Sequence, residues 1–459
     1  MHPRNHLYIR LTAIRTALSS VFGSALAIGA AATLAATLAA TLAATLAATL
    51  AAPLAAQGSL PVNDPGIRRA FDAIQSWNSW ILENQVSLCE IPAPPFKEQV
   101  RGIEFRKRLI ALGYRDTKID VVGNVIAERA GRGGGPTVMI SGHLDTVFPE
   151  GTDVSVKKEG ERYTGAGIGD DCRGLAVILA VARALNEGRI QTLGTVILVA
   201  NVGEEGPGNL RGVRELFNNG YKGKIDRYIS VDGTGFDVTS RAVGSNRYNV
   251  VFTGPGGHSY GAFGRVPSAI HAMGRAIALI DEIVPPPGIK TTYNVGVIKG
   301  GTSVNTISPD GSMEVDMRSE SVDNLAKIDE MIHDAVARAV SAENARWPNS
   351  PAKITVKFDT IGIRPVGRVV QTDATPIIKT ALDAALALDI EAKTSASSTD
   401  SNLPMSLGIP AMTIDGGGRG GNSHAAGEWY EDGATGYKGP QWALLIVASL
   451  AGLAGTTTP

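Results

Sequence analysis

Residues 137–146 read Thr-Val-Met-Ile-Ser-Gly-His-Leu-Asp-Thr, a short apolar run that passes directly into a loop with an imidazole and a carboxylate. The same order recurs downstream: the apolar run 195–202 is followed by Gly-Glu-Glu-Gly (203–206), and the run 227–231 by Asp232. Apolar strands that alternate with helical segments are typical of parallel sheets covered by helices. We therefore predict an α/β fold whose mostly parallel sheet is sandwiched by helices.

The helical spacing of apolar residues supports this fold class. It predicts helices over 67–88, 96–112, 173–186 and 209–218, and shorter runs predict paired strands at 117–122 and 125–129. In such sheets ligands bind beyond the carboxyl ends of the strands. We therefore expect the polar loops that follow the strands to meet at one edge of the sheet.

Length and charge narrow the classes of function. The chain has 459 residues, 44% of them hydrophobic, which is enough for two domains. Its formal net charge is -1 and its basic residues are spread along the chain, so the footprint of a nucleic-acid binder is missing. We expect no nucleic-acid partner.

Residues 1–56 are interpreted as a signal peptide. Three arginines precede an acid-free apolar run that contains a Thr-Leu-Ala-Ala repeat and ends in Leu-Ala-Ala before Gln57, a small-residue cleavage pattern. We therefore expect export, to the periplasm or the medium. The run is also long enough for a bilayer, which needs about 20 residues, so an uncleaved membrane anchor is the alternative. Cys89 and Cys172 are too few for a disulfide scaffold, and both a single bridge and two buried thiols agree with the sequence.

Acids and imidazoles gather in glycine-flanked loops, most of them directly after apolar strands. A lone His-x-Asp or Glu-Glu is usually a loop hydrogen bond or a solvated pair, but crowded carboxylates at the rim of an apolar sheet repel one another unless a cation compensates them. Imidazole nitrogen and carboxylate oxygen suit zinc, with manganese and cobalt as alternatives. The set comprises His143, Asp145, Asp170, Asp171, Glu204, Glu205, Asp232 and His424.

The chemistry of this set fits two cations. Two ions about 3.5–4 Å apart need a bridging carboxylate and can share a hydroxide that attacks a carbonyl. Glu204 and Glu205 are neighbours in extended chain and point to opposite sides, so one can bind metal while the other faces the attacking water. Asp145 is expected to hold the second ring nitrogen of His143 and thereby fix its tautomer.

Six stretches, in order along the chain, resemble a known family: Ser-Gly-His-Leu-Asp-Thr-Val (141–147), Gly-Ala-Gly-Ile-Gly-Asp-Asp (165–171), Gly-Glu-Glu-Gly (203–206), Val-Asp-Gly (231–233), Gly-Gly-His-Ser (256–259) and the late His424. They look like the dinuclear zinc family that contains peptidase T (tripeptide aminopeptidase), carboxypeptidase G, aminoacylase and acetylornithine deacetylase. The local Asp-Asp-Cys-Arg-Gly differs from the more usual Asp-Asp-Lys-Gly, so Asp171 is the alternative to Asp170 as the bridge.

The resemblance implies roles for individual residues. Asp170 would bridge the two ions, His143 and Asp232 would complete one site, and Glu205 and His424 the other. The resemblance makes Glu204 the general base, which takes a proton from the bridging water and passes it to the leaving nitrogen.

Residues 241–364 resemble the inserted lid and dimerisation domain of the family, and we call them the lid segment. Its own pattern predicts a small α+β unit, with strands at 248–253, 293–298 and 312–318 and helices at 267–283 and 322–340. The catalytic domain would then comprise 57–240 and 365–459. The resemblance implies a homodimer formed through the lid segment and substrate-binding roles for His258, Asn305 and Arg318. The alternatives are a plain turn for the His258 loop and a strand ion pair for Arg318.

Asp232 favours the aminopeptidase type, because members that resemble peptidase T carry Asp at this position while carboxypeptidase and deacylase members tend to carry Glu. We therefore expect an exported metallopeptidase that acts on di- and tripeptides. An N-acyl amino acid deacylase on the same scaffold is the alternative. A non-catalytic binding protein ranks below both, because Glu204 and all five expected ligands are present.

Overall fold

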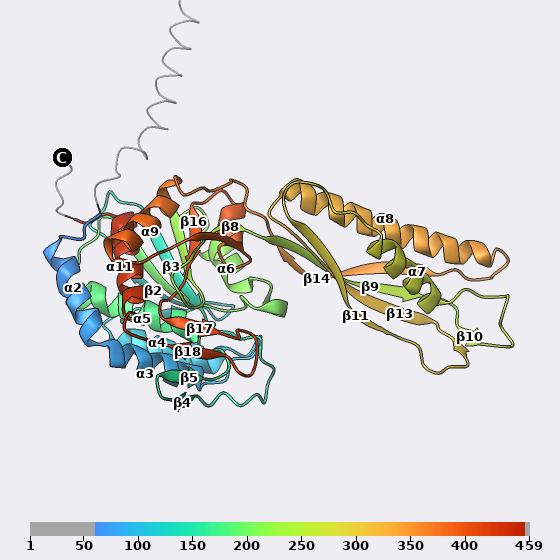
Figure 1. Cartoon of the computed structure of the whole chain (residues 1–459), viewed down its shortest axis with the longest axis horizontal. Coiled ribbons are helices and arrows are strands. Elements are labelled where there is room, and N and C mark those ends of the chain that lie inside the picture. The colour runs from blue at the N-terminus through green and yellow to red at the C-terminus, as the bar shows by residue number, and fades with distance from the viewer. Residues whose placement is uncertain (1–59, 455–459) are drawn as a thin grey trace, which may run out of the picture. The chain divides into compact units, whose positions relative to one another are not determined.

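The computed structural model describes residues Leu60–Ala454, and its larger sheet is mixed but parallel at its centre (Figure 1). Strand β3 pairs in parallel with β6 and β7, and β7 with β16, while β2 and β8 add antiparallel partners outside them. The predicted fold class is confirmed. In spatial order the strands are β1 (Lys118–Ile119), β2 (Val125–Arg129), β6 (Val196–Asn201), β3 (Val138–His143), β7 (Arg227–Val231), β16 (Ala411–Ile414), β8 (Val238–Ala242) and β15 (Thr394–Ser397).

Helices cover both faces of this sheet because its strands are apolar on both sides. Along β3, Val138 and Ile140 join the core formed with helix α5, while Met139 joins a second core with Phe217 and Tyr228 on the other face. The first core involves α2 (Pro65–Ser76), α3 (Asn78–Cys89), α4 (Gln99–Ala111), α5 (Cys172–Glu187), α9 (Pro376–Ala387) and α11 (Lys438–Ala451); the second involves α6 (Arg211–Glu215), a π-helical turn (Leu216–Gly220) and α10 (Asn402–Ser406).

Three predicted helices start at a residue other than the predicted one, and one of them is divided in two. The expected helix 67–88 is two helices, α2 and α3, which are separated at Trp77. Helix α4 begins at Gln99 rather than at Phe96, whose φ of 65° is incompatible with a right-handed helix. Helix α6 begins only at Arg211 for the same reason, since Leu210 has a φ of 58°. The spacing of apolar residues does not predict a positive φ at a residue other than glycine.

The second large sheet lies within the lid segment and is antiparallel. Its strands are β11 (Thr291–Gly300), β13 (Asp310–Ser319), β9 (Gly244–Thr253) and β14 (Thr355–Arg364), in this spatial order. Helices α7 (Ala269–Asp281) and α8 (Val322–Arg346) pack on the face that carries Met313, Val315 and Met317. Because side chains alternate along a strand, Asp316 and Arg318 lie on the opposite face. Strand β14 was not predicted.

Two small sheets complete the described part of the chain. One consists of β17 (Arg419–Gly421), β18 (Trp429–Glu431), β5 (Arg162–Thr164) and β4 (Lys157–Glu159), and the other of β10 (Gly257–His258) and β12 (Thr306–Ile307). The expected signal peptide (1–56) lies outside the described residues. Within Leu60–Ala454, none of the helices is both long enough and apolar enough to cross a bilayer.

Candidate metal centre

The carboxyl edge of the central strands gathers most of the predicted ligands. His143 is the last residue of β3, Asp232 follows β7 directly, and Glu204 and Glu205 come shortly after β6. Asp170 lies just before helix α5. Segments that are distant in the sequence thus place acids and imidazoles close together, as expected for parallel strands that end at the same edge of a sheet.

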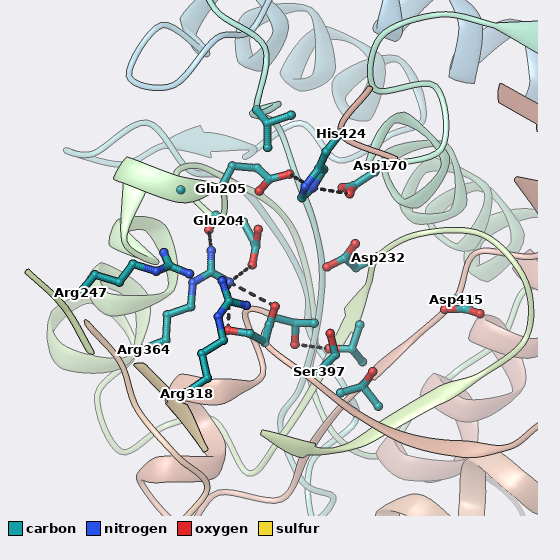
Figure 2. Close-up of a pocket in the computed structure, with 16 residues that line it drawn as sticks. Asp170, Glu204, Glu205, Asp232, Arg247, Arg318, Arg364, Ser397, Asp415 and His424 are labelled. Carbon is teal, nitrogen blue, oxygen red and sulfur yellow. Dashed lines mark hydrogen bonds and ion pairs between the residues drawn. The ribbon is translucent and has the colours of Figure 1, made fainter. Parts of the chain in front are cut away.

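Asp170 lies between the two imidazoles. Its Oδ1 is 3.0 Å from His143 Nε2, and its Oδ2 is 3.2 Å from His424 Nε2 (His424 and Asp170 are labelled in Figure 2). His143 Nε2 is also 3.9 Å from Asp232 Oδ1, and His424 Nε2 is 3.0 Å from Glu205 Oε1. Two ligand groups, His143–Asp170–Asp232 and Asp170–Glu205–His424, therefore share one carboxylate.

Asp171, the alternative bridge, faces away from this centre. Its carboxylate accepts the backbone N–H groups of His143 and Gly174, each at 2.9 Å, and its side chain is fully buried. It therefore caps helix α5 and supports the His143 backbone. The structure brings Asp170, and not Asp171, between the imidazoles.

The electrostatics of the cluster fit cations. Burial, followed by the charge of Asp170, raises the pKa of Asp232 well above its usual range, and burial also raises the pKa of Glu205. Hydrogen bonds to Asp170 and Glu205 raise the pKa of His424 to about 10. Without metal, the crowded carboxylates hold protons on their neighbours, as expected where positive charge is needed. The donor set of nitrogen and carboxylate oxygen suits two divalent ions of the zinc type.

Asp145 contacts His143 through its backbone and the Glu204–Glu205 pair through its side chain. The second ring nitrogen of His143, Nδ1, lies 3.0 Å from the backbone carbonyl oxygen of Asp145 and 3.8 Å from its carboxylate. The nearer contact of the ring is thus the backbone carbonyl of Asp145, and the predicted partner, the Asp145 carboxylate, lies within ion-pair distance of the same nitrogen. The same carboxylate accepts the backbone N–H groups of Glu204 at 3.1 Å and Glu205 at 2.9 Å. A backbone carbonyl fixes the imidazole, and the carboxylate positions the Glu-Glu pair.

Glu428 is a supporting residue that sequence reasoning missed. Its carboxylate accepts the backbone N–H groups of Gly167, Gly169 and Asp170, at 2.8–3.0 Å, and so fixes the loop that presents Asp170. Burial raises its pKa to about 7. Nothing in the local Gly-Glu-Trp sequence marks this role, because the partners lie more than 250 positions away.

Glu204 is paired with an arginine that was also missed. Arg364, the last residue of β14, donates from Nη1 to Glu204 Oε1 at 2.5 Å and from Nη2 to the backbone carbonyl of Glu204. Both side chains are only 6% exposed. The expected base is therefore held by a residue of the lid segment. The two sequence cysteines, Cys89 and Cys172, are free and buried in a small apolar cluster.

The cluster opens into a pocket of about 520 Å³, a size that suits a small ligand. One side carries Asp170, Glu205 and His424, and the other carries three guanidinium groups, those of Arg247, Arg318 and Arg364 (Figure 2). Polar side chains such as Thr239 and Ser397, and the carboxylate of Asp415, complete the wall.

Of the three lid residues that the resemblance implied, only Arg318 lines this pocket in the described chain. His258 is exposed on β10, where its Nδ1 accepts backbone N–H groups from Tyr260 and Gly261. Asn305 is exposed in the neighbouring loop, and its side-chain oxygen accepts the hydroxyl of Ser303. The chain therefore does not bring His258 and Asn305 to its own pocket.

Residues 139–439 match the sequence pattern of Peptidase family M20/M25/M40, and the chain belongs to this family. The predicted resemblance is thereby confirmed. Carboxypeptidase G2 of Pseudomonas sp. (strain RS-16) is 28% identical over 207 residues, which are 43% of this chain and 48% of that protein, so the match spans about half of that relative. Protein YqjE of Bacillus subtilis (strain 168) is 25% identical over 356 residues, which are 73% of this chain and 89% of that protein.

Solved structures share the fold. Aminopeptidase PepT from Bacillus cereus ATCC 10987 superimposes with a TM-score of 0.65 at 20% identity, covering 81% of this chain and 98% of that one. The Bacillus subtilis YXEP protein, described as a dinuclear metal-binding peptidase, gives a TM-score of 0.60 at 19% identity, with 81% and 98% covered. These likenesses support the fold of the hydrolase family.

Proposed function

We propose that this chain is a two-metal aminopeptidase that hydrolyses di- and tripeptides. The observation that carries the proposal is the position of Asp170, whose two carboxylate oxygens each face a different imidazole. A carboxylate shared in this way is what a pair of cations needs. The ligands would be His143 and Asp232 at one ion and Glu205 and His424 at the other, with zinc as the proposed metal and manganese or cobalt as alternatives.

The proposed reaction assigns the proton transfers to Glu204. When bound, two divalent cations would polarise the scissile carbonyl and lower the pKa of a water molecule. Glu204 takes a proton from the attacking water and delivers it to the leaving nitrogen. The Asp145 carboxylate accepts the backbone N–H of Glu204, and Arg364 donates to the Glu204 carboxylate, so both residues hold Glu204 in place.

The two walls of the pocket match the two ends of a short peptide. The guanidinium group of Arg318 suits the terminal carboxylate, which it can grip with two parallel hydrogen bonds. Asp415 follows β16, directly beside the β7 strand that ends before Asp232, and the only donor to its carboxylate within the described chain is the N–H of Asp237, at 2.8 Å. Its remaining capacity as an acceptor suits the free amino group of a substrate.

An N-acyl amino acid deacylase is the second candidate, because the guanidinium groups would serve the carboxylate of an acylated amino acid equally well. One relative, 26% identical over 173 residues, is named indole-3-acetyl-aspartic acid hydrolase, from Enterobacter agglomerans. Rates measured on free tripeptides and on N-acetyl amino acids separate the two candidates. Faster turnover of the tripeptides, and an Asp415→Asn variant whose KM rises for them alone, are the expected results. Preference for the acetylated substrates would favour the deacylase.

Two further properties belong to the proposal. We propose export through the N-terminal segment 1–56, supported by its basic start and small-residue cleavage pattern. We also propose a homodimer formed through the lid segment, supported by the exposed positions of His258 and Asn305, which a second copy could use. Mass measurement of the mature N-terminus tests the first, and sedimentation equilibrium tests the second.

A further inference from the structure

Arg247 lines the pocket but has no assigned role, because the terminal carboxylate of a substrate is assigned to Arg318. Its Nε donates to Asp316 Oδ1 at 2.7 Å, while the Nε of Arg318 donates to the other oxygen of the same carboxylate at 2.8 Å. One aspartate thus holds two guanidinium groups by their Nε atoms. In the described chain their Nη groups have no protein acceptor, and both arginines line the pocket.

The strand register places these groups on one face. Asp316 lies opposite Arg247 across the β13–β9 pair, and Ser245 of β9 lies opposite both Arg318 and Arg364. Residues directly opposite one another project from the same face of a sheet. The three arginines and Asp316 therefore share the face that α7 and α8 leave uncovered.

Arg247 is seated by the backbone beside it. Its other neighbour across β14 is Gly362, where an added Cβ would lie 3.6 Å from Arg247 Cδ. Because Gly362 has no side chain, the aliphatic part of Arg247 can lie beside it. The Arg247 side chain is only 20% exposed. An arginine that is packed and tied at Nε loses little freedom when its Nη groups bind a ligand.

Two acids bond the three arginines of the pocket. Asp316 bonds the Nε atoms of Arg247 and Arg318, and Glu204 bonds Arg364, so the Nη groups of Arg247 and Arg318 keep their donor capacity, and their charge at all working pH values. A terminal carboxylate of the substrate uses one guanidinium fork, that of Arg318. With Arg364 held by Glu204, Arg247 remains as a second donor group for a second anionic group.

We propose that Arg247 selects substrates whose leaving amino acid is acidic, so that the preferred dipeptides end in aspartate or glutamate. This inference rests on the proposed function and names the substrate class of the same pocket. Arg318 takes the terminal carboxylate and Arg247 takes the side-chain carboxylate. The neutral isosteres asparagine and glutamine lose the charge-assisted pair, and Arg247 is left with an unpaired fork.

The test compares isosteric substrates with the metal-loaded full chain. The kcat/KM for Ala-Asp is compared with that for Ala-Asn, and Ala-Glu with Ala-Gln. One lost charge-assisted interaction predicts an acidic preference of about 10–100-fold in the unmodified protein. Arg247→Met should bring this ratio to about 1, and Arg247→Lys, which keeps the charge without the planar pair of donors, should give an intermediate ratio.

Arg241→Met is the matched control, because Arg241 also pairs with an acid of the lid segment, Glu320 at 2.9 Å, but does not line the pocket. It should keep the acidic preference. Melting temperature and circular dichroism show whether each variant is folded. If a variant does not fold, the ratio measured on the unmodified protein still tests the proposal. Equal rates on acidic and neutral substrates, or a preference that survives in Arg247→Met, would overturn the proposal.

A binding measurement separates this inference from the proposed function. Calorimetry with the metal-loaded Glu204→Gln variant gives the Kd values of Ala-Asp and Ala-Asn without turnover. Tighter binding of Ala-Asp by about tenfold supports the role of Arg247 even if the unmodified protein hydrolyses no peptide. Equal Kd values for the two peptides reject the inference. If the unmodified protein nevertheless hydrolyses peptides, the proposed function is retained without the acidic preference.

Discussion

Arg364 Nη1 lies 2.5 Å from Glu204 Oε1, so the last residue of strand β14 is ion-paired with the proposed catalytic base. Arg364 also donates to the backbone carbonyls of Glu204 and Ser398. Because β14 is part of the lid sheet, the environment of the base depends on how that sheet is held. This ion pair therefore joins the lid sheet, which also carries Arg247 and Arg318, to the proposed catalytic base.

Replacing Arg364 by Met should destabilise the protein strongly. Both side chains of the pair are 6% exposed, and removing one partner of a buried ion pair typically costs about 3–5 kcal/mol of unfolding free energy. Urea unfolding of the metal-loaded variant measures the change. In Arg241→Met the partly exposed pair with Glu320 is lost, and the loss should stay below about 1 kcal/mol. Similar losses in the two variants would contradict a buried, structural pair.

Glu204→Gln should remove activity and keep the metal. A general base contributes about 10²–10⁴ to the rate, and the amide cannot take a proton. Peptidase rates and elemental analysis of the same sample measure both quantities. Because Glu204 also lies within a candidate ligand group with His143 and Glu205, a fall in metal content would make it a ligand instead. Full activity in the variant would exclude Glu204 as the base.

Asp170→Asn should lower the metal content more than His424→Ala does. Asp170 faces both imidazoles, whereas His424 belongs to one ligand group. From about two equivalents, as expected for a two-metal site, His424→Ala should retain about one and Asp170→Asn fewer. Within the described residues the exposed carboxylate of Asp153 accepts hydrogen bonds only from Ser155, so Asp153→Asn is the control. Equal metal content in Asp170→Asn and the control would disprove the shared carboxylate.

Metal binding should release protons. Hydrogen bonds to Asp170 and Glu205 raise the pKa of His424 to about 10 in the metal-free protein, so its ring is protonated at neutral pH. A metal ligand must be neutral, so the apparent affinity should rise with pH up to about 10, with about one or more protons released per chain. Calorimetric titration in buffers of different ionisation enthalpy counts these protons. A heat that is independent of the buffer would refute the protonated cluster.

Asp415→Asn should stabilise the protein at high pH and leave it unchanged in acid. Burial raises the pKa of Asp415 to about 7, whereas an unfolded Asp titrates near about 3.9. The folded state therefore holds this proton more tightly, and stability is lost as the pH rises through the interval between these values. The neutral Asn still accepts the N–H of Asp237. We expect a gain of about 1–3 kcal/mol at pH 8, after allowance for solvent screening, and none at about pH 4. A gain that is independent of pH would contradict this origin.

The sheet and the clustering of the acids and imidazoles at its edge could be predicted from the sequence, because both have local signatures. Strand β7 has the predicted bounds, 227–231, and the polar residues after β3, β6 and β7 meet because parallel strands end at one edge. Glu428, Arg247 and Arg364 were missed, since their roles depend on partners far away in the sequence. The contacts of the Asp145 carbonyl with His143 and of its carboxylate with the Glu204 and Glu205 backbone were not predicted, because they depend on the folded loop.

Ser245 of β9 and Arg364 of β14 are paired across neighbouring strands, so the chain leaves and returns to the larger sheet at almost the same point. All five proposed ligands, His143, Asp170, Glu205, Asp232 and His424, lie outside the 241–364 interval. The residues between these two strands, and with them the proposed substrate specificity, can therefore change during evolution while all five proposed ligands keep their positions. Chimeras joined at this point are the natural way to transplant specificity between relatives.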